Sequence, residues 1–427
     1  MSSCLLSVRF LLKTLIAILL VVTSGSMVAA DVSPLSGPLG SRVTMNPLAQ
    51  ARRFGASRSS PSGNKWVIRD LGLPVTGLPP SAAVPTPYAI DASGDVALAT
   101  CPPAGCDNIV PPGRAEAFLY DYRLARLIQL AKLPGRFNPP AVDQAVPHAL
   151  NNRGQIVGAV VRTVGSNTVS VPVMWTRQGS TGSRIARLDA TPGDQGTAYG
   201  VNDIGVTVGS VYTGPYLPNS FEAGNAVLFT GGAPVLLASN APGGGSDAYG
   251  INGVGTAVGD VFAGSAAVFT GGNAIPIPQQ YQCPPPNDVC DQNAAFAINK
   301  AGDVLGNYVT NFFDQGTQSY VGFLWKDNSF TTVAPTCFDS DCPIHYEPGD
   351  TDFVLALNAK DDFVGSFDGQ PWVSFSPVGD ANGLLPPNSG WRIISVAAIN
   401  DRRQIVGQGY NAAHGSDVRA FLLEPRH

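Results

Sequence analysis

Charged residues are scarce in this chain. They make up 13% of its 427 residues, with 26 Lys and Arg against 31 Asp and Glu. Because nucleic-acid phosphates are bound by clustered Lys and Arg, this acidic balance argues against nucleic acid as a partner. Apolar runs after residue 30 are short and alternating, without a helical period and without the length of a membrane span. The composition therefore argues against a helical bundle and against a span beyond the N-terminus.

Signatures of the common enzyme sites are also lacking. The sequence has no Gly-x-Ser-x-Gly elbow, no His-Glu-x-x-His pair and no phosphate loop after a strand. Only four His are present. His148 stands where related segments have Tyr or Phe, which favours a packing role, and His345 lies in a loop after Cys342. These two remain the candidates for a catalytic general base.

The N-terminus has the features of a secretory signal. Arg9 and Lys13 precede a short apolar run, and the small residues Val28-Ala29-Ala30 come before Asp31. We predict a signal peptide over 1–30, with an uncleaved membrane anchor as the alternative, and a secreted or periplasmic protein. Residues 31–64 are rich in Ser, Gly, Pro and Arg and predict a flexible lead-in to one domain over 65–427.

Six cysteines follow the signal segment in three close pairs. An even number in an exported chain is typical of disulfides, and pairing by proximity is the simplest arrangement. A metal site is the alternative, but no His lies at ligand spacing beside a pair. The predicted pairs are Cys101/Cys106, Cys283/Cys290 and Cys337/Cys342.

Gly (48) and Pro (36) are abundant, and one short motif recurs. It reads apolar–Asn–two residues–usually Gly–two residues–apolar–Gly. The Asn, here called the anchor residue, tolerates a left-handed backbone and caps a turn with its side chain, and the Gly three residues later supplies a positive φ. Each copy therefore predicts a tight hairpin whose second strand ends at the last Gly. The seven anchor residues are Asp91, Asn151, Asn202, Asn252, Asn299, Asn358 and Asn400, with Asp361 and Arg403 replacing the turn Gly in the last two copies.

A period near 50 residues with four short strands indicates a repeat architecture. A third strand such as Ala117–Tyr120 and a fourth such as Leu124–Leu130 follow most anchors. The seventh copy stops after its third strand, Ala420–Leu423, whereas an unpaired strand, 65–72, precedes the first copy. Joining the two closes a ring without exposed edges. We therefore predict an all-β, seven-bladed β-propeller of four-stranded antiparallel blades, closed by residues 65–72. Fewer blades with a separate domain is the alternative.

This topology separates two faces. The anchor hairpins and the turns between third and fourth strands lie on one, the plain face. The long connections lie on the other, the long-loop face, where binding residues on rigid scaffolds are usually found. The predicted long connections are 73–87, 99–115, 131–147, 159–171, 210–224, 280–294, 307–320, 334–352, 386–395 and 408–418.

The chain resembles the HAF-repeat family of bacterial extracellular proteins. The likeness is carried by the anchor motif, by Ala117-Phe118 and Ala420-Phe421, and by Asp70-Leu71-Gly72, and it covers 65–425. The resemblance implies a secreted, propeller-like repeat protein and no particular activity.

Two groups of residues on the long-loop face are candidates for binding. Aromatic rings suit sugar or protein contact, although they also serve as local core. The aromatic candidates are Tyr212, Tyr216, Tyr281, Phe312, Phe313, Tyr346, Trp391 and Tyr410. One loop gathers carboxylates that suit Ca²⁺, although the spacing matches no defined calcium loop and a solvated acidic loop is the alternative. These candidates are Asp339, Asp341, Asp350 and Asp352.

Three functions are compatible with the sequence. The first is a binding or interaction protein, more in keeping with the missing catalytic signatures, whose ligand is a glycan or an envelope or extracellular partner. The second is an extracellular polysaccharide-degrading, lyase-type propeller enzyme using His148 or His345. The third is a purely structural role.

Overall fold

The computed structural model describes most of the repeat region. The described residues are 65–72, 84–101, 115–134, 143–164, 167–191, 193, 195–212, 224–238, 245–261, 265–278, 292–312, 317–333, 353–367, 369–376 and 379–426. The predicted signal peptide and lead-in lie outside these ranges. Within them, no helix has the length and apolar character needed to cross a membrane.

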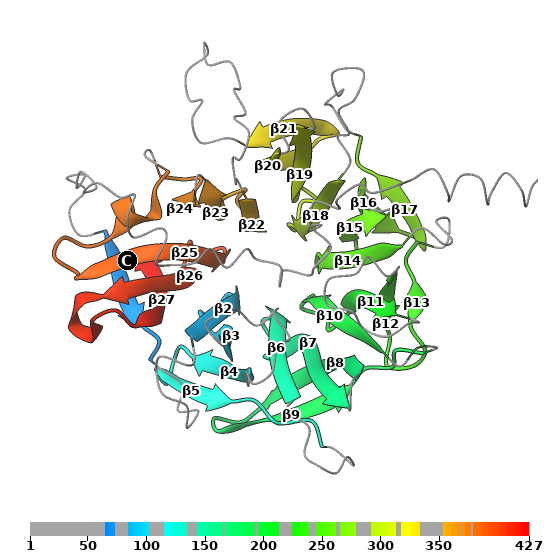
Figure 1. Cartoon of the computed structure of the whole chain (residues 1–427), viewed down its shortest axis with the longest axis horizontal. Helices are drawn as coiled ribbons and strands as arrows, with labels where there is room; N and C mark the ends of the chain where they lie inside the picture. The colour runs from blue at the N-terminus through cyan, green and yellow to red at the C-terminus, as the bar shows by residue number, and fades with distance from the viewer. Residues whose placement is uncertain are drawn as a thin grey trace, which may run out of the picture. The chain divides into compact units, whose positions relative to one another are not determined.

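Seven antiparallel sheets are arranged in a ring (Figure 1). Each blade starts with an innermost strand at the centre. The innermost strands of blades one to seven are β2 (Val84–Ile90), β6 (Asp143–Leu150), β10 (Gln195–Val201), β14 (Ser246–Ile251), β18 (Gln292–Ile298), β22 (Phe353–Leu357) and β25 (Trp391–Ile399). The second strands are β3 (Val96–Cys101), β7 (Gln155–Val164), β11 (Thr207–Tyr212), β15 (Ala257–Val261), β19 (Val304–Phe312), β23 (Phe363–Phe367) and β26 (Ile405–Asn411).

The outer strands complete the blades. The third strands are β4 (Glu116–Asp121), β8 (Asn167–Gln178), β12 (Asn225–Phe229), β16 (Ser265–Thr270), β20 (Thr317–Lys326), β24 (Gln370–Val373) and β27 (Val418–Pro425). The fourth strands are β5 (Arg126–Gln129), β9 (Gly182–Arg187), β13 (Val235–Leu236), β17 (Asn273–Pro276), β21 (Ser329–Val333) and, for blade seven, β1 (Trp66–Asp70). Blade six has three described strands, followed by a bridge from Trp372 to Asp380 and the 3-10 turn η3 (Ala381–Leu384). A second 3-10 turn, η4 (Ala412–His414), precedes β27.

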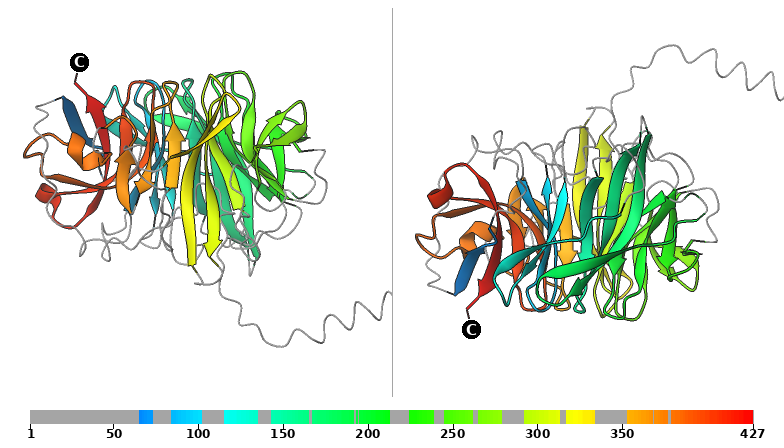
Figure 2. Two further views of the ribbon diagram at one scale, coloured as in Figure 1. Left: turned by 90° about the horizontal axis from the view of Figure 1, so that it is seen from above. Right: turned by 90° about the horizontal axis from the view of Figure 1, so that it is seen from below.

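The predicted seven-bladed β-propeller is confirmed, and so is its closure. Strand β1 pairs antiparallel with β27 from Trp66 opposite Pro425 to Asp70 opposite Phe421. Figure 2 shows β1 and β27, dark blue and red, side by side in one blade. The Arg419 side chain donates to both carboxylate oxygens of Asp70, each at 3.0 Å. The first and last strands therefore hold the ring together.

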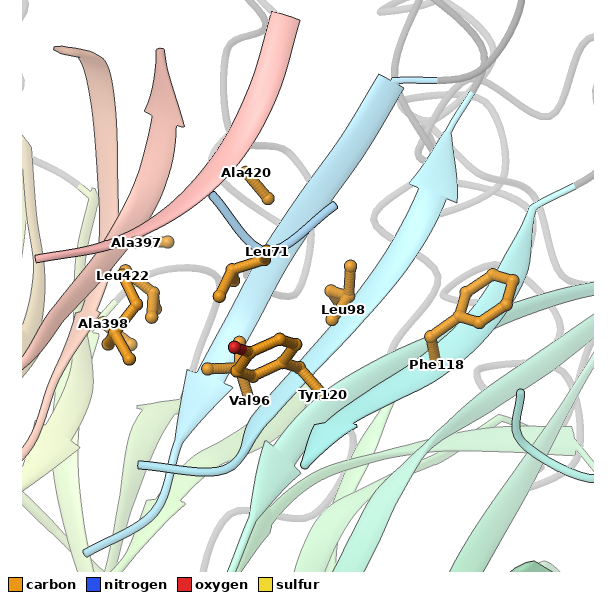
Figure 3. Close-up of a cluster of buried hydrophobic side chains, with 10 residues drawn as sticks. Leu71, Val96, Leu98, Phe118, Tyr120, Ala397, Ala398, Ala420 and Leu422 are labelled. Atoms are coloured by element: carbon orange, nitrogen blue, oxygen red, sulfur yellow. The ribbon is translucent and has the colours of Figure 1, made fainter. Parts of the chain in front are cut away.

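The core is divided among the seven seams between blades. Each seam contains at least one cluster of buried apolar side chains, because alternate residues of every strand point to opposite neighbours. At the closing seam, Leu71 packs with Leu98 of blade one and Leu422 of blade seven (Figure 3). The N-terminal strand thus contributes apolar burial as well as backbone pairing.

The anchor hairpins adopt one conformation in all seven copies. The left-handed backbone falls on the fourth residue, with φ +71° at Gly154 and, where the Gly is replaced, +62° at Asp361 and +61° at Arg403. None of the anchor residues has a positive φ, so the left-handed backbone that Asn tolerates is not used there. The predicted cap of the turn by the Asn side chain is confirmed. In the second copy, Asn151 Oδ1 accepts from the amides of Arg153 and Gln155, each at 3.0 Å.

The anchor side chains also join neighbouring blades. In each of six copies the Asn Nδ2 donates to a group in the next anchor hairpin. Five of the acceptors are the next anchor's carbonyl: Asn151 to Asn202 (2.8 Å), Asn202 to Asn252 (3.0 Å), Asn252 to Asn299 (3.3 Å), Asn358 to Asn400 (3.1 Å) and Asn400 to Asp91 (2.8 Å). Asn299 donates instead to the Asp361 carboxylate at 2.7 Å. One residue type therefore forms the turn and fastens the ring.

Two expectations about strand lengths need correction. The last Gly of the motif does not end the second strand: Gly158 lies inside β7, opposite Pro147 of β6. A Cβ at this position would lie 2.1 Å from the Val146 carbonyl oxygen, so the Gly permits close approach of the two strands. The predicted connections 159–171 and 307–320 consist largely of strand, because β7–β8 and β19–β20 form long hairpins.

Candidate functional site

Every innermost strand contains a β-bulge at the same place. The pairing register shifts across the residue three positions before the anchor residue. A bulge re-aims the extra side chain and is common beside functional sites. The bulged residues are Tyr88, His148, Tyr199, Tyr249, Phe296, Leu355 and Ala397.

The first five of these side chains form a continuous series of ring contacts around the centre. Successive ring centroids lie 6.0, 5.3, 5.4 and 5.5 Å apart from Tyr88 to Phe296. Tyr199 and Tyr249 are buried to 2% exposure. The aromatic series therefore serves first as packing between the inner strands of blades one to five.

His148 belongs to this series. Its ring lies between Tyr88 and Tyr199, edge-on to both, and is buried to 5% exposure. This position supports the interpretation of His148 as a packing substitute for Tyr or Phe. It also places a titratable imidazole between two phenols on the innermost strands.

A group of hydrogen-bonded polar side chains lies at the long-loop ends of the inner strands of blades three and four. Asp247 of β14 lies directly opposite Asp260 of β15 in the ladder. Tyr249 Oη donates towards Asp260 Oδ2 at 3.2 Å and lies 3.5 Å from Asp247 Oδ2. The buried hydroxyl of Ser210, in blade three, donates to Asp247 Oδ1. Two carboxyls thus share one phenol across a pair of strands.

The cluster continues into blade three through a second pair of phenols. The hydroxyls of Tyr199 and Tyr212 lie 2.9 Å apart. Tyr212 ends β11 and is partly exposed, as are Asp247 and Asp260. We call these six residues the Asp/Tyr cluster: Tyr199, Ser210, Tyr212, Asp247, Tyr249 and Asp260. Tyr199, Ser210 and Tyr249 of this cluster are buried, whereas Tyr212, Asp247 and Asp260 are partly exposed.

The electrostatics of the cluster are unusual for aspartates. Burial raises the pKa of Asp247. Burial first, and then the charge of Asp247, raise the pKa of Asp260 well above its ordinary value. Burial and the two carboxylates also raise the pKa of Tyr249. Because like charges cannot both be solvated here, the pair retains a proton at pH values where isolated aspartates are ionised.

The equivalent positions in neighbouring blades are uncharged. Blade three has Thr197 opposite Ser210, and blade five has Ala294 opposite Asn307. The scaffold therefore does not require carboxyls at this place. Sequence reasoning missed Asp247 and Asp260, but aligning the copies on their anchor residues would have shown two acids where other copies have neutral residues.

The predicted aromatic candidates do not converge in one described place. Tyr212 belongs to the cluster, whereas Trp391 and Tyr410 lie in blade seven, where Trp391 packs edge-on to the core residue Phe421 at 6.1 Å. Phe312 ends β19, and its side chain is outside the described set. The candidates wholly outside the described residues are Tyr216, Tyr281, Phe313, Tyr346, His345, Asp339, Asp341, Asp350 and Asp352.

The cysteine pairs stay predictions. Cys101 ends β3, is buried, and its Sγ lies 3.8 Å from the hydroxyl of Tyr88. Its predicted partner Cys106 and the other four cysteines, Cys283, Cys290, Cys337 and Cys342, lie outside the described residues.

The fold and this site define a seven-bladed β-propeller with an acid–phenol cluster at one end of its inner strands. No family model and no curated protein matches the chain. Among solved structures it is similar to an oxidoreductase of the glucose dehydrogenase type from Thermus thermophilus, at 12% identity and a TM-score of 0.32, covering 84% of this chain and 99% of the other. It is also similar to a Trypanosoma rangeli sialidase, at 9% identity and a TM-score of 0.33, covering 80% of this chain and 54% of the other.

Proposed function

We propose that this chain is an extracytoplasmic binding protein that recognises a glycan through its long-loop face, with the Asp/Tyr cluster as part of the binding site. The observation that carries the proposal is the set of two carboxyls and three phenols gathered at the long-loop ends of blades three and four. Carboxyl and phenol groups bind sugar hydroxyls as donors and acceptors. The partly exposed Tyr212 adds a flat ring, which buries ligand area at low entropic cost.

The raised pKa values of Asp247 and Asp260 support this assignment. Perturbed titratable groups concentrate at functional sites, because a fold held only by packing gains nothing from opposed carboxyls. Carboxylates directly opposite each other destabilise a sheet. Since the equivalent residues in blades three and five are neutral, Asp247 and Asp260 incur a cost to the fold that a ligand would explain.

A glycan array followed by affinity electrophoresis in polysaccharide gels tests the proposal. We expect the wild-type protein to be retained by at least one polymer, and Asp260→Asn and Tyr212→Ala to lose most of that retention. Asp327→Asn is the matched control, because Asp327 is an exposed carboxylate in a turn of the plain face. Retention that is unchanged in both cluster variants, or no retention on any glycan, would refute the assignment.

Glycan cleavage is a second candidate function. The favouring observation is again Asp260, since a carboxyl with a raised pKa beside a second carboxyl and a phenol suits a general acid. A lyase-type reaction at His148, between Tyr88 and Tyr199, is the other form of this idea. New reducing ends lost in Asp260→Asn would indicate hydrolysis. Unsaturated products that are lost in His148→Ala would indicate a lyase. If neither kind of product forms, binding without cleavage remains as the function.

A further inference from the structure

One of the seven anchor residues is not an Asn. Asp91 occupies the anchor position of blade one and is buried to 6% exposure. Its Oδ1 accepts from the amides of Ser93 (2.8 Å) and Asp95 (2.9 Å), as Asn151 Oδ1 does in the next copy. The turn is therefore the same, and the second carboxyl oxygen takes the place that Nδ2 has in the other copies.

The groups around the Nδ2 position are hydrogen-bond acceptors. In the second copy Nδ2 of Asn151 donates to Gln155 Oε1 at 2.7 Å and to the Asn202 carbonyl at 2.8 Å. In the seventh, Nδ2 of Asn400 donates to Gln404 Oε1 at 2.7 Å and to the Asp91 carbonyl at 2.8 Å. By position in the repeat, the groups equivalent to these two acceptors are, for Asp91, the Asp95 carboxylate, whose charge adds to burial in raising the pKa of Asp91, and the Asn151 carbonyl of the next hairpin. An ionised Asp91 would place a carboxylate oxygen against two acceptors, whereas a protonated Asp91 has the missing donor.

We propose that Asp91 is a protonation-dependent latch between blades one and two, whose Oδ2–H donates to the Asn151 carbonyl in the protonated form and leaves that seam unlatched in the ionised form. This inference is independent of the proposed glycan site, which lies on the opposite face. The anchor residues of the other six copies are uncharged Asn, and five of them donate to a backbone carbonyl of the next hairpin, a bond that involves no titratable group.

Several charged groups surround Asp91. Asp95 lies in its own hairpin, and Arg177 of β8 pairs with Asp95 at 2.8 Å and also with Asp121 at the end of β4. On the blade-seven side, Gln404 separates the hairpin from Glu424, to which it donates at 2.9 Å. Burial first, and the Asp95 carboxylate second, raise the pKa of Asp91 to about 6. Because Arg177 is engaged by two other carboxylates, it does not cancel this shift.

The seam keeps other fastenings when the latch is open. The amide of Ala92 donates to Asn152 Oδ1 at 2.8 Å, and Arg177 still bridges the two blades. Deprotonation therefore loosens one hairpin without opening the ring. A group whose pKa is raised in the folded state stabilises that state as pH falls, so the latch strengthens between about pH 7 and pH 4.

Urea unfolding of the full chain at pH 7.5 and pH 5 tests the latch. A pKa near 6 in the folded state against about 3.9 unfolded makes the folding equilibrium constant rise about tenfold between these pH values. Asp91→Asn supplies a permanent donor and lacks this component. We expect Asp91→Asn to be more stable than wild type at pH 7.5, and the ratio of their equilibrium constants to change about tenfold by pH 5.

Asn202→Asp is the reciprocal variant, because it moves the same substitution to the seam between blades three and four. It should acquire a pH dependence of the same sign as that of wild-type Asp91. In parallel, carboxyl ¹³C shifts of Asp-labelled protein should show a resonance that titrates near pH 6 and is missing in Asp91→Asn. A ratio of wild type to Asp91→Asn that is equal at both pH values, or an Asp91 resonance that titrates near pH 4, would overturn the proposal.

Discussion

The anchor residue Asn151 provides a quantitative test of how the ring is fastened. Its buried side chain makes four hydrogen bonds, two as acceptor to the hairpin amides of Arg153 and Gln155 and two as donor, to Gln155 Oε1 and the Asn202 carbonyl. Each bond contributes about 1 kcal/mol net, and a buried group left unpaired costs about 1–3 kcal/mol. Asn151→Ala removes all four. We expect a loss of about 3–5 kcal/mol in the free energy of unfolding.

Asn151→Asp separates the two functions of the side chain. It keeps both acceptor bonds to the hairpin amides and loses both donor bonds, so about 2–3 kcal/mol of the loss should remain at neutral pH. Asn152→Ala is the comparison variant for an exposed position: its side chain accepts from the Ala92 amide at 2.8 Å and donates to the Asp203 carboxylate at 2.7 Å, and both bonds are exposed to solvent. Its removal should cost less than about 1 kcal/mol.

Equilibrium unfolding in urea, followed by near- and far-ultraviolet circular dichroism, measures these differences. Coincident transitions are required for the free energies to be comparable. If Asn151→Ala were no less stable than Asn152→Ala, the anchor side chains would contribute little and the seams would depend on apolar packing alone. Equal losses for Asn151→Ala and Asn151→Asp would place the whole effect on the two donor bonds, to Gln155 Oε1 within the hairpin and to the Asn202 carbonyl across the seam.

Three further predictions follow from the same structure. Gly259→Ala should prevent folding or lower the free energy of unfolding by several kcal/mol, because the added Cβ would lie 1.8 Å from the Asp247 carbonyl oxygen. Gly253→Ala is the control, since it has open space around it, and its stability in thermal unfolding should be within about 1 kcal/mol of wild type. Leu71→Ala should cost about 2–4 kcal/mol through the closing seam, and Leu124→Ala, at 44% exposure, almost nothing; equal urea midpoints would contradict the role of the N-terminal strand. Asp260→Asn should stabilise the fold at pH 7.5, and the gain should shrink as pH falls, because burial raises the pKa of the wild-type carboxyl and that carboxyl becomes protonated; a gain in urea unfolding that is independent of pH would refute the raised pKa.

The repeat pattern predicted the architecture well, because the determinants of the ring are local. A residue that must adopt a positive φ and a strand left without a partner are both visible in the sequence, as Gly154 and residues 65–72 show. The pattern did not reveal that the Asn side chain reaches the next blade. That bond depends on the distance between hairpins about 50 residues apart, which only the closed ring determines.

The candidate site was less predictable for a related reason. Trp391 and Tyr410 were selected as exposed loop aromatics, but they lie in blade seven, away from Tyr212. Aromatic residues on loops cannot be separated from local core by type alone. Asp247 and Asp260 were not selected, because single aspartates near strand ends are common. Their significance comes from being opposite each other in the ladder.

The seven copies of the repeat can be compared with one another, and this comparison identifies acidic residues that a single copy does not reveal. Asp91 stands where six copies have Asn, and Asp247 and Asp260 stand where blades three and five have neutral residues. The shared backbone shows that each position tolerates an uncharged side chain, so the fold does not explain the carboxyls. Both sites are buried enough to raise the pKa of their aspartates. Acidic residues that interrupt a repeated neutral position are therefore the places where this propeller departs from its scaffold, one at a seam and one at the long-loop face.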